Sequence, residues 1–290
     1  GDNSSCTDCG RVIVLKLQNG IWSQLGNEFY GTVASAGAFG LSVSLNAAGD
    51  VLAIGDQEND DAGANRGAIS IYKYEGGSWI AKGSTIYPTQ LGSTAHIDNE
   101  KWGDAIDLND AGDILIAGSS EWNSSQGMFK VFKYDGTTWN IYGEPKSGAA
   151  DSKYGHSVSI NAEGNVISIG ARKYSSNKGR GYVFLLDETI SPNIWRNQQY
   201  GGALIDPNTD RSFSWSQNTN ELGTVNVMGS PNKNNSTGRN GEVSVWRGIH
   251  KDIGGGEIQP SQIQIGGYIP GEGANDRFGW SVDINDEGDI

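Results

Sequence analysis

The sequence is poor in the residue types that mark several common classes of protein. It has 2 cysteines, 7 prolines and 2 methionines in 290 residues. It contains no apolar run of about 18 residues, the length a helix needs to cross a membrane. Its 21 basic residues stand against 34 acidic residues, which gives a net charge of −13. Because such an acidic surface repels nucleic acid and anionic lipid, we expect neither as a partner.

Glycine and tryptophan are abundant instead. The chain has 43 glycines and 9 tryptophans. Many glycines together with many aromatic residues favour short strands and tight turns over helices. The hydrophobic content of 36% is enough for one large core or two ordinary ones.

Four strand-like segments recur in a fixed order along the chain. The first begins with an aromatic residue that glycine usually follows, and its copies are 39–46, 102–109, 154–161 and 278–285, with a weaker copy at 213–220. The second is an apolar run that usually ends in glycine, and the third follows a loop and begins with glycine. The fourth contains a tryptophan in most units, at Trp22, Trp79, Trp139 and Trp195, with spacings of 57, 60 and 56 residues.

Each unit therefore contains four short strands with alternating apolar and polar residues. A repeat of about 60 residues with four strands is typical of a β-propeller blade, because radial packing buries both faces of each sheet. A β-solenoid is the alternative, but its coils are usually shorter and have fewer strands. We predict an all-β propeller of which about five blade equivalents are visible.

The repeat motifs resemble a known family. Residues 39–43 read aromatic-Gly-x-Ser-Val, residues 49–55 read Gly-Asp-x-Leu-x-Ile-Gly, and residues 67–72 read Gly-x-Ile-x-Ile-Tyr. This order resembles the FG-GAP repeat, which forms the seven-bladed propeller of integrin α subunits. The resemblance is strong over 39–139 and weak over 200–260. It implies that the aromatic-Gly strand is innermost and the tryptophan strand outermost, but it implies little about function.

The resemblance also divides the chain. We treat 1–290 as one propeller or part of one, with units at 10–38 (partial), 39–101, 102–153, 154–212, 213–277 and 278–290 (partial). Asp289 matches Asp113, which begins a buried central strand in its own unit. We therefore expect a longer intact protein with seven or more blades. The alternative is that the two ends together complete a fifth blade.

Two kinds of loop are expected at the two ends of the blades. The turns between the first and second strands and between the third and fourth strands are short. The other loops are long and variable, as at 56–66, 84–101 and 230–240. Because binding usually lies in variable loops on a rigid frame, we expect a protein or glycan partner at this long-loop face. Self-assembly through unpaired strands is a further expectation.

Several loop residues are candidates for modification. The N-x-Ser/Thr sequons all lie between second and third strands, at Asn3, Asn123, Asn234 and Asn235. Glycosylation and an unmodified polar loop both remain open for them. Cys6 and Cys9 form a C-x-x-C pair, for which we predict a local disulfide, with free thiols as the alternative. A four-thiolate zinc site would need a second pair, which the sequence lacks.

The sequence suggests no catalytic residue, cofactor or metal. The family's calcium loops are not preserved, because turns such as 46–50 are too short and too poor in carboxylates. Ser157 lies in "GHSVS" but holds the strand position of Ser42 and Ser281, and the second glycine of a nucleophile elbow is missing. Non-repeating aromatic residues on the long-loop face are the candidates for sugar stacking: Tyr87, Trp122 and Tyr174.

We therefore expect a non-catalytic, extracellular or cell-surface glycoprotein that serves as a structural or adhesion module, as a subunit of a polymeric assembly or filament. A carbohydrate-binding or carbohydrate-active propeller, lectin or glycosidase, is the alternative. An intracellular protein-interaction scaffold is the third interpretation. The disulfide and the sequons favour the first, since both belong to an oxidising, secretory route.

Overall fold

The computed structural model describes residues 9–31, 38–88, 98–197, 204, 212–235, 238–252 and 258–289. Almost all regular structure in these residues is β. The two helices are single four-residue turns, α1 (Trp122–Ser125) and α2 (Tyr174–Asn177), and both contain left-handed residues. Neither is long and apolar enough to span a membrane.

Four sheets of consecutive antiparallel strands make up most of the chain. Blade 1 contains β5 (Phe39–Leu45), β6 (Val51–Asp56), β7 (Ala68–Glu75) and β8 (Ser78–Ala81). Blade 2 contains β9 (Ala105–Leu108), β10 (Ile114–Ser119), β11 (Met128–Tyr134) and β12 (Trp139–Ile141), with β13 (Lys146–Ser147) paired to β11. Blade 3 contains β14 (Tyr154–Ile160), β15 (Val166–Ala171), β16 (Arg180–Asp187) and β17 (Ile194–Asn197).

Blade 4 contains β18 (Ser216–Thr219), β19 (Val225–Ser230), β22 (Glu242–Asp252) and β23 (Ile258–Pro270), with a small hairpin of β20 (Asn234–Asn235) and β21 (Gly238–Arg239) between its second and third strands. An N-terminal unit precedes blade 1: β1 (Arg11–Val12) pairs with β4 (Phe29–Tyr30), and β2 (Leu15–Gln18) pairs with β3 (Ile21–Gln24). Residues 278–289, the C-terminal segment, follow blade 4 and form no named strand.

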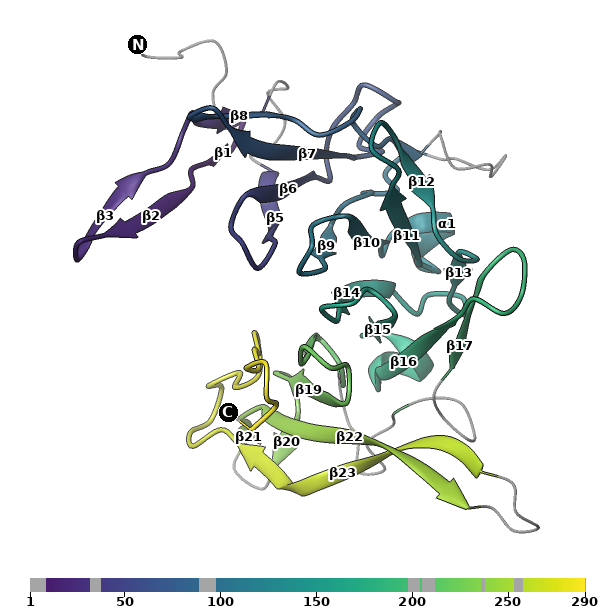
Figure 1. Cartoon of the computed structure of the whole chain (residues 1–290). Coiled ribbons are helices and arrows are strands. Elements are labelled where there is room, and N and C mark those ends of the chain that lie inside the picture. The colour runs from purple at the N-terminus through teal and green to yellow at the C-terminus, as the bar shows by residue number, and fades with distance from the viewer. Residues whose placement is uncertain are drawn as a thin grey trace.

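The blades fan out along an arc with their first strands on its inner side (Figure 1). The inner strands contact one another in sequence, β5 with β9, β9 with β14, and β14 with β18. This arrangement is a β-propeller and confirms the predicted fold and the innermost place of the aromatic-Gly strand. The N-terminal unit and the C-terminal segment lie on either side of the opening of the arc, and within the described residues they do not pair into a joint fifth blade.

Aliphatic side chains fill the space between neighbouring blades. Between blades 1 and 2, Ile69 and Ile71 of β7 belong to one core cluster with Leu115 and Ala117 of β10. The aromatic residue that begins the unit is buried in blades 2, 3 and 4, where Trp102, Tyr154 and Phe213 are 1%, 3% and 0% exposed. Burial of such side chains is the main term that holds adjacent sheets together.

Glycine allows the blades to approach closely. Gly67 forms a parallel bridge to Trp102 of the next blade, and Gly127 forms the equivalent bridge to Tyr154. A Cβ on Gly127 would lie 2.2 Å from the carbonyl oxygen of Tyr154, and the φ of Gly127 is +79°. Only glycine fits both the space and the backbone conformation.

A polar belt links the inner strands. The four blades and the C-terminal segment each contribute one residue from the same repeat position, namely Ser44, Asp107, Ser159, Asn218 and Asp283. Ser44 Oγ donates to Asp107 Oδ1 at 3.0 Å, and Ser159 Oγ donates to Asn218 Oδ1 at 2.8 Å. These side-chain bonds cross from one blade to the next, so they fix the register between sheets that share no backbone ladder.

Candidate ligand-binding site

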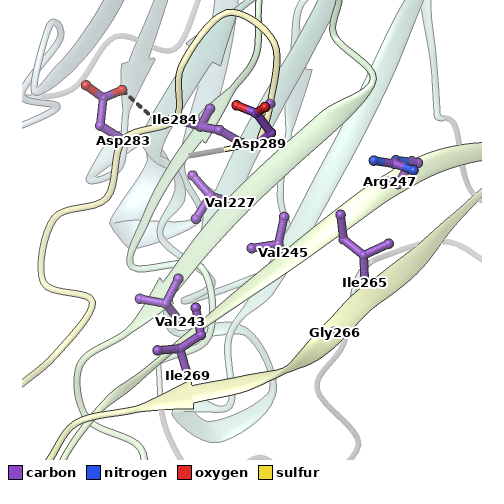
Figure 2. Close-up of a pocket in the computed structure, with 11 residues that line it drawn as sticks. Val227, Val243, Val245, Arg247, Ile265, Gly266, Ile269, Asp283, Ile284 and Asp289 are labelled. Atoms are coloured by element: carbon purple, nitrogen blue, oxygen red, sulfur yellow. Dashed lines mark hydrogen bonds between the residues drawn. The ribbon is translucent and has the colours of Figure 1, made fainter.

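Two separate regions of the structure are candidates for a binding site. A cavity of about 600 Å³ lies against blade 4, with mostly aliphatic walls from Val227, Val243, Val245 and Ile269 (Figure 2). A cluster of charged and aromatic side chains lies elsewhere, on the loops at the long-loop face of blades 2 to 4 and on residues 277–280 after blade 4. Recognition of a polar ligand needs convergent polar groups, so we place the candidate site at this second cluster.

The cluster is built on one position of the repeat. The third residue of the repeat differs among blades 1 to 4, being Leu41, Asp104, His156 and Trp215 in turn, and the C-terminal segment has Trp280 at this position. In blades 1 and 3 this residue falls in a bulge, where the pairing shifts between Phe39 and Ser42 and between Tyr154 and Ser157. Bulges redirect side chains out of the regular alternation, so this position is free to carry a different group in each blade.

A strained turn fixes the same position. The backbone N–H of Asp104 donates to the carbonyl of Lys101 at 3.2 Å, and that of His156 donates to Lys153 at 3.2 Å. The turn requires a positive φ at the residue before the aromatic, 56° at Lys101 and 55° at Lys153. Left-handed conformations are unfavourable for lysine, so surrounding contacts must stabilise them.

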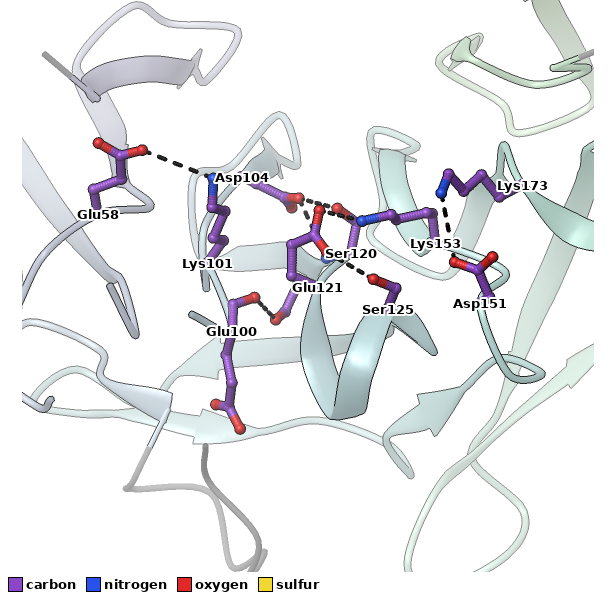
Figure 3. A network of polar contacts seen from close by, with 11 residues as sticks. Glu58, Glu100, Lys101, Asp104, Ser120, Glu121, Ser125, Asp151, Lys153 and Lys173 are labelled. Carbon is purple, nitrogen blue, oxygen red and sulfur yellow. Dashed lines mark hydrogen bonds and ion pairs between the residues drawn. The ribbon is translucent and has the colours of Figure 1, made fainter. Parts of the chain in front are cut away.

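Loops that follow the second strands meet these turns (Figure 3). Ser120, after β10, donates to Asp104 Oδ2 from its hydroxyl at 2.5 Å and from its backbone N–H at 3.2 Å. The next residue, Glu121, forms an ion pair with Lys153 and accepts a bond from Ser125 Oγ at 2.8 Å. The network therefore joins blades 2 and 3 through charged side chains.

Burial changes the protonation of two groups in the site. It raises the pKa of Asp104 to about 7, and the bonds from Ser120 only partly oppose this. Burial, with Arg172 and Lys153 nearby, lowers the pKa of His156 to about 3, so its imidazole is neutral at physiological pH. Asp104 is thus a carboxyl group that exchanges a proton near neutral pH, a property typical of functional sites.

Arginine and tryptophan side chains form a stack beside this network. The guanidinium carbon of Arg172 lies 4.6 Å from the ring centroid of Trp215. The rings of Trp215 and Trp280 have centroids 4.8 Å apart, and the guanidinium of Arg277 lies 5.5 Å from Trp280. His156 meets Trp215 edge-on, with centroids 5.1 Å apart. Two cations and two indoles therefore form one continuous row.

Some polar atoms of the site have no partner among the described residues. Asp104 Oδ1 and Arg172 Nε are buried and make no hydrogen bond there. Neither Arg172 nor Arg277 forms an ion pair with a described residue. Since a buried unpaired polar group costs about 1–3 kcal/mol, these atoms mark places where a ligand or water would bind favourably.

The described residues contain no group of three His, Cys, Asp or Glu side chains that could hold a metal ion. A carboxylate of the acidic loop after β6 accepts a hydrogen bond from within the loop: Asp60 Oδ1 accepts from the backbone N–H of Asn65 at 2.7 Å. It therefore offers no preformed metal cage in the part of the chain that the structure describes.

The predicted sugar-stacking residues lie in separate surroundings. Tyr87 donates to Asp61 Oδ2 at 3.2 Å and lines a cavity of about 210 Å³ with Asp56. Trp122 and Tyr174 occupy equivalent places after β10 and β15. The guanidinium of Arg180 lies 3.8 Å from the ring centroid of Tyr174 and covers that face. Their role in sugar stacking stays a prediction.

The predicted modification sites are only partly described. Asn123 lies in α1 and donates to Gln126 Oε1 at 2.6 Å, and Asn234 lies in β20, so both follow the second strand of a blade as expected. Asn235 follows Asn234 in β20, and Asn3 and Cys6 lie outside the described residues. Cys9 is 6% exposed. Glycosylation and the Cys6–Cys9 disulfide stay predictions.

The sequence interpretation missed the site described above. It treated Trp102, Trp215 and Trp280 as parts of a repeat and passed over the residue that follows the aromatic-Gly pair. The signal was present in the sequence. The third position of the repeat carries leucine, aspartate, histidine or tryptophan, whereas the first position is aromatic in every copy. Variation at one position of a regular frame is what a binding surface requires.

Comparison with known proteins gives the fold but no family. No family model and no curated protein matches the chain. A periplasmic gluconolactonase of Pseudomonas aeruginosa matches with 12% identity and a TM-score of 0.49, over 88% of this chain and 64% of its own. TolB from Acinetobacter baumannii matches with 12% identity and a TM-score of 0.46, over 90% of this chain and 49% of its own. The chain thus spans about half to two thirds of the lengths of the structures it matches.

These comparisons correct the functional expectation. The propeller is supported, whereas the FG-GAP resemblance is not. Neither neighbour is described as an integrin or an adhesion protein, and the first is described as a gluconolactonase, so the adhesion or filament module expected from the resemblance was wrong. The error arose because the repeat motif reports strand positions, which many unrelated propellers share.

Proposed function

We propose that the protein binds a saccharide that carries a carboxylate group, at the Arg–Trp row of the long-loop face. The observation behind the proposal is the stack of Arg172, Trp215, Trp280 and Arg277. Trp280 is 49% exposed, and an exposed indole is a suitable surface for the apolar face of a sugar ring.

The two arginines account for the carboxylate. A guanidinium that stacks on an aromatic ring through its face keeps the N–H groups at its edge free, and these bind a carboxylate through two parallel bonds. Arg172 Nε is buried without a partner in the described residues, so a carboxylate would satisfy it. Because the net charge of −13 repels anions at long range, the attraction must come from these local cations.

We propose binding rather than catalysis, and a location outside the cytoplasm. The proposed location outside the cytoplasm rests on the predicted disulfide and sequons, and the gluconolactonase neighbour is periplasmic by its description. The proposal of binding without catalysis is tested by incubating the protein with the saccharide that it binds and assaying for newly released reducing ends. Turnover that depends on Asp104 would replace binding with hydrolysis.

Titration of tryptophan fluorescence tests the ligand class. An oligomer of galacturonic acid should bind at least about tenfold more tightly than the galactose oligomer of equal length, a difference of about 1.4 kcal/mol. Arg172→Gln and Trp280→Ala should each weaken binding of the acidic oligomer. Arg180→Gln is the matched control, because Arg180 also stacks on a ring, that of Tyr174, outside the row. Equal binding of both oligomers, or loss of binding only in Tyr174→Ala, would reject the Arg–Trp row as the site.

A further inference from the structure

We infer that the cavity between the N-terminal unit and blade 1, separate from the Arg–Trp row, binds a primary alkylammonium group, the side chain of a lysine or a small free amine. The next blade shows such a group in the equivalent place. In blade 2, Lys130 of β11 is 2% exposed, and its ammonium nitrogen lies 5.7 Å from the ring centroid of Trp102. The equivalent residue of blade 1 is Ser70, whose side chain is too short to fill the same space.

Blade 1 has a cavity of about 210 Å³ at this place. Its aromatic walls come from the N-terminal unit, from blade 1 and from the loop that follows blade 1, namely Tyr30, Phe39, Tyr72 and Tyr87. Phe39 holds the repeat position of Trp102, the ring beside the buried lysine of blade 2. Because aromatic faces attract cations, several rings around one pocket are typical of sites for organic ammonium groups.

Two carboxylates supply negative charge to the cavity. Asp56, which is 8% exposed, and Asp61 both line it. Burial raises the pKa of Asp56, the bond that Asn59 Nδ2 donates at 3.4 Å opposes this, and the nearby charges of Asp61 and Glu58 raise the pKa further. No lysine, arginine or histidine is among the described residues that line the cavity. Since a buried carboxylate is stable only when its charge is compensated, a bound cation would stabilise Asp56.

Blades 1 and 2 differ in a complementary way at two repeat positions. Asp56 of blade 1 matches Ser119 of blade 2, and Ser70 matches Lys130. Blade 2 therefore supplies its own cation, whose charged form the carboxylate of Glu100 favours. Blade 1 has a carboxylate at one of these positions and no cation at the other, so an ammonium group from a ligand would restore the pairing of charges.

The polar groups of the cavity favour a primary ammonium group over a quaternary one. A primary ammonium donates three hydrogen bonds and needs an acceptor for each. The carboxylates of Asp56 and Asp61 line the cavity together with the hydroxyls of Ser70 and Thr85, whose oxygen atoms lie 3.4 Å apart. A quaternary ammonium has no N–H group and would leave these acceptors without a donor.

NMR titration of the full chain with n-butylammonium chloride at constant ionic strength tests the inference. This ion reproduces the lysine side chain, so we expect saturable binding with a Kd below about 10 mM. n-Butanol, which lacks the charge, and tetramethylammonium, which lacks the N–H groups, should each bind at least about tenfold more weakly. Nα-acetyl-lysine methylamide distinguishes the sources of the group. Binding at least as tight as that of n-butylammonium indicates a lysine of a polypeptide, and weaker binding indicates a free amine.

Variants of the cavity give an independent arm. Ser70→Lys should place the chain's own ammonium in the cavity, as Lys130 does in blade 2, and abolish binding of n-butylammonium in a protein that still folds. Asp56→Asn, which adds no bulk, should weaken binding at least about tenfold. Asp110→Asn makes the same change at an exposed position outside the cavity, so binding should stay within about twofold of the parent.

Four results would overturn the inference. They are no saturable binding of n-butylammonium up to about 100 mM, equal binding of n-butanol, equal binding by the parent and Asp56→Asn, and binding of calcium, lost in Asp56→Asn, by a protein that does not bind n-butylammonium. The last result would assign the cavity to a metal ion.

Discussion

The guanidinium of Arg172 lies 4.6 Å from the ring centroid of Trp215, although the two residues belong to different blades. Arg172 follows β15 of blade 3, and Trp215 precedes β18 of blade 4. Their contact joins the loop after a second strand to the turn before a first strand. The residues at the same two repeat positions in blade 2, Ser120 and Asp104, also contact each other, but within one blade, so equivalent loop and turn positions make different contacts along the propeller.

Replacement of Arg172 by lysine should separate the contribution of its charge to ligand binding from the contribution of its planar shape. Lysine keeps the positive charge but loses the planar group that stacks on Trp215 and forms two parallel bonds. We expect Arg172→Lys to recover less than half of the binding energy that Arg172→Gln loses. Fluorescence titration with the galacturonate oligomer measures both variants. Full recovery by lysine would show that charge alone accounts for the role of Arg172.

Asp104 should make the stability of the protein depend on pH. Its folded-state pKa of about 7 lies above the ordinary 3.8, so between these values the folded chain holds a proton that the unfolded chain has lost. The free energy of unfolding should therefore decrease as the pH rises toward 7. Asp104→Asn cannot ionise, so at pH 8 it should be more stable than the parent by up to roughly 4 kcal/mol, and little different near pH 4.

Urea denaturation at pH 4 and pH 8 measures this effect. His156 acts in the opposite direction, because its pKa is lowered to about 3 and its neutral form is lost as the pH falls. The variant is therefore compared with the parent at each pH, and Asp110→Asn, at an exposed position, serves as the control. A stability difference that is the same at both pH values would contradict the buried, protonated carboxyl.

Asp107 should be a principal contributor to the contacts between blades. Its Oδ1 accepts from Ser44 Oγ of blade 1 at 3.0 Å, and its Oδ2 accepts from the backbone N–H of Ile160 of blade 3 at 3.0 Å. Asp107→Ala leaves two partly buried donors unpaired, one on each side, so we expect a loss of roughly 2–3 kcal/mol in the free energy of unfolding. Denaturant unfolding tests this, with Asp110→Ala as a control expected to change stability by less than about 0.5 kcal/mol. A small effect at Asp107 would mean that water replaces its bonds.

Glycine at position 127 should be indispensable for blade packing. Gly127→Ala would place Cβ 2.2 Å from the Tyr154 carbonyl oxygen, so we expect destabilisation of at least about 3 kcal/mol or failure to fold. Gly76→Ala is the matched control, because Gly76 also has a positive φ, +60°, but nothing lies within 4 Å of its Cβ position. The control should cost only about 1 kcal/mol, the strain of the backbone alone. Equal losses, measured by thermal unfolding, would exclude close approach as the cause.

Local chemistry was sufficient to predict the blade. Alternation of apolar and polar residues in runs such as 68–74, with tight turns between them, specifies four strands and their order along the chain. The inner place of the aromatic-Gly strand came from the family resemblance, and the structure confirms it although the FG-GAP assignment itself is unsupported. Function did not follow from the same motif, because residues such as Trp102 serve the packing between blades and say nothing about a ligand.

The candidate site was decided by tertiary structure. The sequence by itself determined the repeat, its four strands and the short turns, because each depends on residues close together in the chain. The approach of Arg172 to Trp215, and the burial that raises the pKa of Asp104 to about 7, depend on how one blade packs against the next. Groups separated by some 40 residues meet there because inter-blade packing and strained turns fix the loops, and no local pattern encodes that distance.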